Sequence, residues 1–317
     1  MKKSFLVFVV LLLFAVSTAI SVVVWWNSAM KAPSSDSSKT RFLITKGMSA
    51  GEIAKKLEGE GLIKSELAFR IYVQINDLSK NIPAGEYDIS KNLDLKGVIS
   101  ALLGGPSEVW VTIPEGLRRE EIAKKLVLAL GLTLDEAKLF EGEFLRYSAG
   151  LEGYLFPDTY LFPKDVAAEK VVARLNEVFG TRAGEISSNQ VILASLIERE
   201  TKGNQEKPVV AGIILKRLSA DWPLQIDATV QYAVGSVDDW WPILTREDLE
   251  INSPYNSYKN QGFPPTPIAN PGLASINAAK KPEESDYWFY LHDSSGQIHY
   301  AATLEEHNEN ISKYLGK

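Results

Sequence analysis

Two glutamates stand two positions apart near the middle of the chain, in a segment with the spacing of a helix. Within residues 189–202, apolar residues such as Leu196 and Ile197 recur on one side; Glu200 falls on that side, whereas Glu198 points away. A lone carboxylate among apolar groups costs free energy unless it is paired or protonated. Burial raises the pKa of a carboxyl group, as a general acid at neutral pH requires. We therefore predict that Glu200 is a catalytic acid and that Glu198 is solvated.

The same spacing leaves a second interpretation of Glu200 open. Structural ion pairs also place carboxylates inside proteins, so Glu200 could instead be bonded to Lys216, Arg217 or the N-terminus of a helix. Residues 191–194 are apolar on every side, which predicts that this helix is buried in a larger body.

Four strings follow one another in a fixed order from this helix onward. They are ASLIERET (194–201), VVAGIILKRL (209–218), LQIDATVQY (224–232) and SPYNSYKNQGFPPTPIANPG (253–272). Together they resemble the endolytic murein transglycosylase family, the MltG or YceG-like proteins, over a region from about Phe42 to the C-terminus. In that family the catalytic acid is the glutamate directly before the threonine, which is Glu200 here. The chain departs from the usual LQTDPTV string at Ile226 and Ala228.

Polar and aromatic residues in the third and fourth strings are predicted to bind substrate. Asp227 is the second carboxylate near Glu200, although it could instead be a turn or N-cap aspartate before Thr229. Prolines make residues 253–272 a rigid loop of the kind that often walls a site. The predicted substrate-binding residues here are Gln225, Asp227, Thr229, Tyr255, Asn256 and Tyr258.

The string LEGYLFPDTYLFPKD at residues 151–165 supplies three further candidates. It is similar to the family's EGxxxPDT string, which suggests Glu152, Tyr154 and Asp158 as additional substrate-binding residues. Its aromatic side chains could line a sugar cleft, or they could pack in the core, the more frequent role of aromatic residues.

Composition narrows the classes of function. A formal net charge of −6 without a long basic run argues against nucleic acid as a partner. Because the chain has no cysteine, disulfides, thiol catalysis and cysteine-ligated zinc are excluded. His292, His299 and His307 lack metal-ligand spacing. We therefore expect neither a metal nor a cofactor.

The first 26 residues predict a membrane anchor. Lys2 and Lys3 precede an uncharged apolar run, residues 4–26, that is long enough to cross a bilayer and ends at Trp25 and Trp26. The alternative is a cleaved signal peptide, but its apolar core is usually shorter. An anchor would leave the N-terminus in the cytoplasm of a bacterium and the rest of the chain outside the inner (cytoplasmic) membrane.

The remaining chain is predicted to have an α+β fold in two parts. Residues 27–40 are serine-rich and are expected to form a flexible tether. The resemblance implies a LysM-like α+β subdomain at residues 41–105, which binds glycan or serves as a spacer, and a larger α+β catalytic region at residues 106–317. Residues 44–57 are echoed at 113–126, which predicts a second strand–turn–helix unit at residues 109–126.

Local patterns predict several helices and strands before and after the helix that contains Glu200. Ser49 and Glu52 form a capping-box pattern at the start of a helix. Residues 206–220 have helical spacing, residues 286–303 have the pattern of a hairpin, and a final helix follows.

Three functions remain in competition. The resemblance favours a membrane-anchored endolytic lytic transglycosylase, a carbon–oxygen lyase that cuts peptidoglycan between MurNAc and GlcNAc with Glu200 as acid and base. It would leave 1,6-anhydro-MurNAc ends and would terminate or trim nascent glycan strands. The alternatives are a non-catalytic peptidoglycan-binding scaffold that recruits synthases of elongation or division, and a hydrolytic muramidase that uses Glu200 and Asp227.

Overall fold

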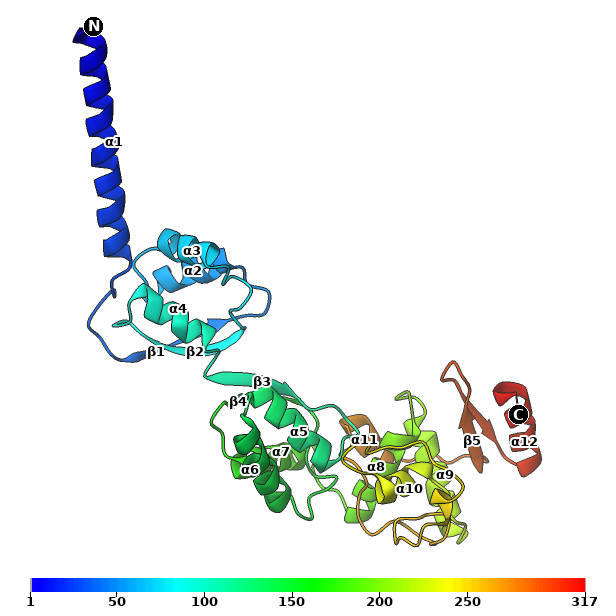
Figure 1. Ribbon diagram of the computed structural model, residues 1–317. Helices are drawn as coiled ribbons and strands as arrows, with labels where there is room; N and C mark the ends of the chain where they lie inside the picture. Colours follow the sequence, from blue (N-terminus) through cyan, green and yellow to red (C-terminus); the bar gives the residue numbers. More distant parts are fainter. Residues whose placement is uncertain (1, 317) are drawn as a thin grey trace. The chain divides into compact units, whose positions relative to one another are not determined.

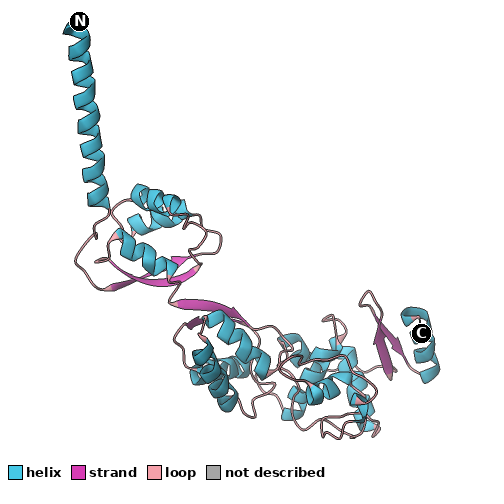
Figure 2. Cartoon of the chain, in the orientation of Figure 1, coloured by secondary structure: helices cyan, strands magenta, loops and turns pink. Residues whose placement is uncertain are grey.

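The computed structural model describes residues 2–316, so Met1 and Lys317, the ends of the predicted anchor and catalytic region, lie outside it. The chain forms two compact units. The first comprises Met1–Trp110 with Leu161–Lys164, and the second comprises Val111–Tyr160 with Asp165–Lys317. Both contain helices and strands, and the predicted mixed α+β class is confirmed (Figure 2).

An apolar helix, α1 (Lys2–Ala29), begins the described chain (Figure 1). Its segment Val10–Ala29 has a mean hydropathy of 2.0, and by length and composition it could cross a membrane. The helix ends by joining the first unit, because Ala29 is only 4% exposed and lies in that unit's core. The carbonyl of Met30 accepts a hydrogen bond from the Leu95 amide. Part of the stretch expected to be a flexible tether is therefore bound to the first unit, since its apolar residues find a core to enter.

The first unit places three helices over a pair of antiparallel strands (Figure 1). Its elements are β1 (Lys39–Ile44), α2 (Ala50–Gly59), α3 (Glu66–Ile75), β2 (Gly85–Ser90) and α4 (Leu95–Leu103). Buried and exposed residues alternate along β1, and Phe42 pairs with Tyr87 on the buried face. The predicted capping box at Ser49 and Glu52 is present at the start of α2.

Two further strands complete one four-stranded sheet in the order β1-β2-β3-β4. They are β3 (Glu108–Thr112) and β4 (Thr159–Pro163), the segments through which the chain passes from one unit to the other. After β3 the chain repeats the local structure that follows β1. Gly47 and Gly116 both have positive φ, 94° and 76°, at matching positions of the turn that precedes a helix.

The second unit is mainly helical, with a small hairpin near its end (Figure 2). Its helices are α5 (Arg119–Leu130), α6 (Leu134–Tyr147), α7 (Ala168–Ala183), α8 (Ser188–Glu200), α9 (Lys207–Ser219), α10 (Asp227–Val234), η1 (Asp248–Glu250), α11 (Leu273–Lys280) and α12 (Leu304–Leu315). Its hairpin consists of β5 (Phe289–His292) and β6 (Ile298–Ala301), which pair antiparallel as predicted.

Helix α8 forms the centre of this unit. Every residue from 191 to 197 is buried, and α9, α10 and α11 pack around the helix. Burial of each large aliphatic side chain contributes about 1.5–3 kcal/mol. Ser195 is also buried, and its hydroxyl accepts a hydrogen bond from the amide of Ile268, 3.1 Å away. That bond ties the proline-rich segment to α8, so the predicted burial of this helix is confirmed.

Candidate active site

Glu200 is the last residue of α8. The helix stops there because Thr201 is extended, with φ −118° and ψ 147°. The amide and the hydroxyl of Thr201 both donate to the carbonyl of Ile197, at 3.1 and 2.7 Å. This arrangement fixes the direction in which the Glu200 side chain leaves the helix. A negative charge at a helix C-terminus is disfavoured by the helix dipole, which favours the protonated carboxyl.

The surroundings of the Glu200 carboxyl favour its neutral form. Burial raises its pKa most strongly, while a hydrogen bond from the Tyr290 hydroxyl, 2.7 Å from Oε2, lowers it. The charge of Asp227 raises this pKa further, and the charges of Arg217 and His292 lower it. As a residue Glu200 is only partly buried. A partly buried carboxyl group with a raised pKa has the properties of a general acid.

The cations predicted as alternative partners of Glu200 are bonded elsewhere. Arg217 donates from Nε and Nη2 to the carbonyl of Trp288, at 2.9 and 2.7 Å, and from Nη1 to that of Leu224, at 2.7 Å. Lys216 donates to the carbonyl of Ser285, at 3.1 Å. Arg217 therefore influences Glu200 through its field rather than through an ion pair.

Asp227 is the first residue of α10 and is exposed. The Tyr258 hydroxyl donates to its Oδ1 at 2.5 Å. Asp227 lies close enough to Glu200 for the two charges to interact. The structure thus brings together two of the predicted substrate-binding residues, Asp227 and Tyr258, beside the predicted acid.

Gln225 precedes α10 in a conformation that few residues with a side chain adopt. Its φ is +53°, in the left-handed region, and its side chain is exposed. Its amide donates to the carbonyl of Ser257 at 3.1 Å. Strained backbone persists where the surrounding structure imposes it, often at ligand sites.

Two other predicted residues in this region are buried and have internal partners. Thr229 is fully buried, and its hydroxyl bonds the carbonyl of Ile226 at 2.7 Å and the Ser257 hydroxyl at 2.8 Å. Asn256 is also fully buried and donates to the carbonyls of Leu249 and Ile251, both at 2.9 Å. These two side chains hold the loops that present Asp227 and Tyr258.

Tyr255 contacts both the proline-rich segment and α10. It is half-buried, its hydroxyl shares a hydrogen bond with that of Thr266 at 2.7 Å, and its ring centroid lies 4.8 Å from that of Tyr232. Tyr255 thereby ties the proline-rich segment to α10.

Glu152 belongs to a different set of hydrogen bonds from Glu200. It is buried, accepts from the Arg119 amide at 3.3 Å and from Asn270 Nδ2 at 2.7 Å, and burial raises its pKa to about 8. It therefore joins segments that are far apart in sequence. Tyr154 packs its ring edge-on against Phe179, and Asp158 pairs with Arg182 at 3.3 Å.

The prediction that Glu198 is solvated is wrong. Its side chain is 9% exposed and forms an ion pair at 3.2 Å with Lys207, which is 5% exposed. Its Oε2 also accepts from the Gly272 amide at 2.9 Å and from the Ser275 hydroxyl at 2.7 Å. Glu198 thereby caps the N-terminus of α11. The prediction failed because α9 and α11 cover the side of α8 that was assumed to face water.

Sequence reasoning missed three groups around the acid. Tyr290 bonds Glu200, and two residues further along β5 His292 bonds Glu206 at 2.9 Å. Arg217 was considered only as an ion-pair partner. The aromatic strand was recognised, but its spacing gives no indication of which distant helix it meets.

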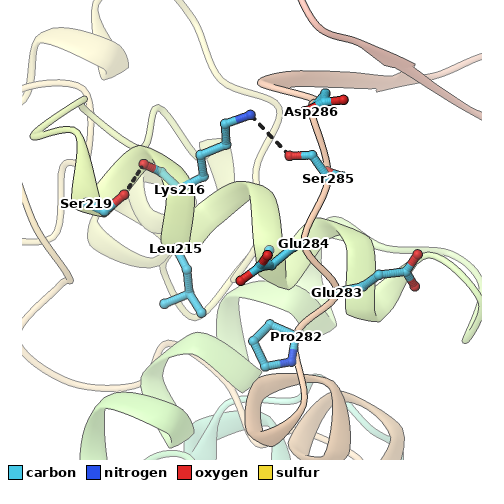
Figure 3. A pocket seen from close by; sticks show the side chains of 9 residues that line it. Leu215, Lys216, Ser219, Pro282, Glu283, Glu284, Ser285 and Asp286 are labelled. Carbon is cyan, nitrogen blue, oxygen red and sulfur yellow. Dashed lines mark hydrogen bonds between the residues drawn. The ribbon is translucent and has the colours of Figure 1, made fainter.

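A separate cavity of about 540 Å³ lies between α9 and the segment that leads to β5 (Figure 3). It is lined by Gly212, Leu215, Lys216, Ser219 and residues 282–286. Its lining contains none of the predicted site residues. The Lys216–Ser285 bond crosses the space between its two walls.

A partly buried carboxyl at a helix end, with a second carboxylate and two tyrosines around it, supplies the groups that acid–base chemistry requires. Residues 42–313 match the YceG-like family, and the chain belongs to that family. The predicted family resemblance is thus confirmed.

Named relatives of the chain agree with this assignment. The chain is 33% identical to an endolytic murein transglycosylase of Bacillus subtilis strain 168, over 92% of this chain and 89% of the relative. It is 27% identical to an endolytic murein transglycosylase of Streptococcus pneumoniae strain D39, over 86% of this chain but only 58% of that longer protein. The crystal structure of a yceG-like protein from Listeria monocytogenes matches with a TM-score of 0.55 and 29% identity, over 86% of this chain and 98% of that one.

Proposed function

We propose that this protein is an endolytic peptidoglycan lytic transglycosylase in which Glu200 is the general acid and base. The observation that carries the proposal is the Glu200 carboxyl, whose pKa burial raises, at the partly buried end of a rigid helix. The names of the relatives supply the substrate class, the glycan strands of murein. No metal or cofactor enters the proposed reaction.

The reaction needs one carboxyl group in two successive roles. Protonated Glu200 donates to the oxygen that links MurNAc to GlcNAc, and the bond from that oxygen to the anomeric carbon breaks. The ionised carboxylate then takes the proton from the 6-hydroxyl of the same MurNAc ring, while the oxygen of this hydroxyl attacks the anomeric carbon. Because the attack is intramolecular, it gains from proximity and requires no enzyme nucleophile. The product is a 1,6-anhydro-MurNAc end.

Asp227, Tyr258 and Gln225 are proposed to contact the glycan. Asp227 places a negative charge near the carbon on which positive charge develops, and Tyr258 holds that carboxylate in one orientation. Gln225 presents an exposed amide from a strained backbone just before Asp227. We propose that Thr229, Asn256 and Tyr255 act indirectly, by holding the loops that present Asp227 and Tyr258. Glu152, Tyr154 and Asp158 are proposed to stabilise the framework outside this cluster.

The first unit is proposed to be LysM-like and to grip glycan. A cavity of about 320 Å³ between α2 and α3 supports this proposal, since its size suits a small ligand. Helix α1 is proposed to anchor the chain in a bacterial inner membrane, with the two units outside the cytoplasm. The enzyme would then meet nascent strands near the membrane, where synthases of elongation or division are candidate partners.

Replacement of Glu200 by glutamine tests the proposed function. Glu200→Gln should lower turnover of purified glycan strands by about 10²–10⁴-fold, because a general acid contributes that much. The variant should remain folded, since glutamine can still bond Tyr290. Full activity in this variant would remove Glu200 from the reaction and leave the scaffold alternative in place.

The chemistry of the products separates a lyase from a muramidase. Digestion in H₂¹⁸O should give anhydro ends without ¹⁸O, because water does not enter the proposed reaction. Asp227→Asn should slow turnover without changing the product. Reducing MurNAc ends that carry ¹⁸O would instead show a hydrolase that uses two carboxylates.

A further inference from the structure

The two oxygens of the Glu200 carboxyl have different surroundings. Oε2 accepts from the Tyr290 hydroxyl at 2.7 Å. Within residues 2–316, no group donates a hydrogen bond to Oε1. A proton that moves to substrate must leave from an oxygen whose position is fixed but whose proton is not shared with the protein. Oε1 meets that requirement.

We propose that Tyr290 is a positioning residue that holds Oε2 of Glu200 and leaves Oε1 to carry the transferred proton, a role that rests on the function proposed above for Glu200. The hydroxyl donates both to the carboxylate and to the carbonyl oxygen of the protonated acid. It therefore keeps the orientation of the carboxyl through both steps of the reaction.

Tyr290 is suited to this role because its strand is fastened on both sides. Two residues before it, the carbonyl of Trp288 accepts two hydrogen bonds from Arg217, at 2.9 and 2.7 Å. Two residues after it, His292 bonds Glu206 at 2.9 Å. The strand also pairs with β6, where Tyr290 lies opposite Tyr300. A group held by such a shell is positioned more closely than one on a free loop.

The charged and titratable groups around Glu200 indicate how loss of this hydroxyl would change the pH dependence. Arg217 on α9, Asp227 on α10 and His292 on β5 act on Glu200 through their charges. The Tyr258 hydroxyl bonds Asp227 and is itself within reach of the Glu200 charge. The hydrogen bond from Tyr290 stabilises the ionised form and lowers the pKa of Glu200, so its removal should raise that pKa. Burial raises the pKa of Tyr290 itself well above 10, so it stays a donor at neutral pH.

Tyr290→Phe tests the proposal, with Tyr287→Phe as the matched control. Tyr287 is exposed on the segment that leads to β5, and its ring stacks on Tyr300. The control therefore also loses one hydroxyl, but one without a bond to Glu200. Both variants are assayed on purified glycan strands for kcat and KM across pH 4–10 (roughly the range in which a buried carboxyl titrates).

The two variants should differ in rate and in pH dependence. In Tyr290→Phe, kcat at the optimum should fall about tenfold while KM stays unchanged, because a lost orienting hydrogen bond affects the acid and not binding. The alkaline limb of the kcat–pH profile, along which Glu200 loses its proton, should move to higher pH. Tyr287→Phe should match the wild type. Equal pH profiles for all three proteins, or a change in KM alone, would overturn the proposal.

A second measurement needs no substrate. It separates a change in the pKa of Glu200 from a general loosening of the β5–β6 hairpin. The ¹³C-carboxyl resonance of Glu200, assigned by its loss in Glu200→Gln, is titrated in the wild type and in Tyr290→Phe. The midpoint should move upward in Tyr290→Phe while the thermal midpoints of the two proteins stay similar. An unmoved midpoint overturns the role of Tyr290 even if Glu200 is catalytic. Activity retained in Glu200→Gln instead overturns the proposed function, whatever the titration shows.

Discussion

At the scale of residues, two carboxylates on one helix end have opposite surroundings. Glu198 receives three hydrogen bonds, including one from a buried ammonium group, whereas Glu200 receives one from a neutral hydroxyl. A carboxylate with several donors is satisfied in its ionised form, and one with few donors inside a protein keeps its proton. The difference gives Glu198 a structural role and agrees with the acid–base role proposed for Glu200.

Glu198→Gln should therefore destabilise the second unit. The substitution leaves the Lys207 ammonium buried without its counter-ion, and removal of one partner from such a pair costs about 3–5 kcal/mol. Urea denaturation measures the change. The double variant with Lys207→Met should recover much of the loss, because neither charge then remains. Wild-type stability in Glu198→Gln would show that the ion pair contributes nothing.

Glu200→Gln should have the opposite effect on stability at neutral pH. Burial raises the pKa of Glu200 in the folded protein above its value in the unfolded chain. Below the unfolded pKa both states hold the proton, and the group does not disfavour the folded state. As pH rises from the unfolded pKa through the folded pKa, the folded protein loses stability, because the unfolded chain ionises more readily. Glu200→Gln should unfold at a higher temperature than wild type at pH 8, and the gap should close near pH 4, roughly the unfolded pKa of a glutamate.

At the scale of elements, periodicity and caps predicted much of the second unit's centre. The burial of α8, the helix α9, the β5–β6 hairpin and the final helix α12 all followed from local patterns. Helices α7, α10 and α11 were not predicted. Helix α10 has only eight residues, and α11 has its N-terminus capped by Glu198 from another helix rather than by a local side chain. A distant cap leaves no local sequence signal.

The candidate site was predictable only in part, for a similar reason. Glu200 could be found because its own helix carries the apolar stripe around it. Tyr290 could not, since it lies 90 residues further along the chain and meets Glu200 only through the packing of the hairpin. Thr229 and Asn256 belong to strings that resemble the family, and a string does not distinguish a side chain that contacts substrate from one that holds a loop.

The segment that leads to β5 crosses directly over α9, and Gly212 permits that crossing. A Cβ atom at Gly212 would lie 1.9 Å from the carbonyl oxygen of Glu283, so backbone would have to move. Gly212→Ala should destabilise the unit by about 1–3 kcal/mol and lower activity, because the strand that carries Tyr290 shifts. Gly142→Ala, in an open position on α6, is the control and should gain up to about 1 kcal/mol. Chemical denaturation measures the free energy of unfolding of both variants. Equal changes in Gly212→Ala and Gly142→Ala would show that the close crossing at Gly212 does not matter for stability.

At the scale of the whole molecule, chain order places the apolar helix α1 at the start of the first compact unit. The end of that helix is shared with the first unit, because Ala29 enters its core and the Met30 carbonyl bonds the Leu95 amide. The segment proposed to anchor the chain and the core of the first unit therefore meet within a few residues. The position of a truncation decides which of the two is lost.

A variant that lacks residues 1–26 should be soluble and folded, with much weaker action on cell wall in vivo. The apolar run is gone together with Trp26, which packs against the first unit's core, but Ala29 remains in that core and Met30 remains against it. A variant that lacks residues 1–30 should also be soluble, but the loss of these two apolar groups should lower the first unit's stability by about 1–3 kcal/mol. Fractionation of cells and thermal unfolding of the purified variants test both expectations. The full-length gene should also be expressed. If its product is then recovered from the soluble fraction and lacks the apolar run, the run is a cleaved signal peptide rather than an anchor.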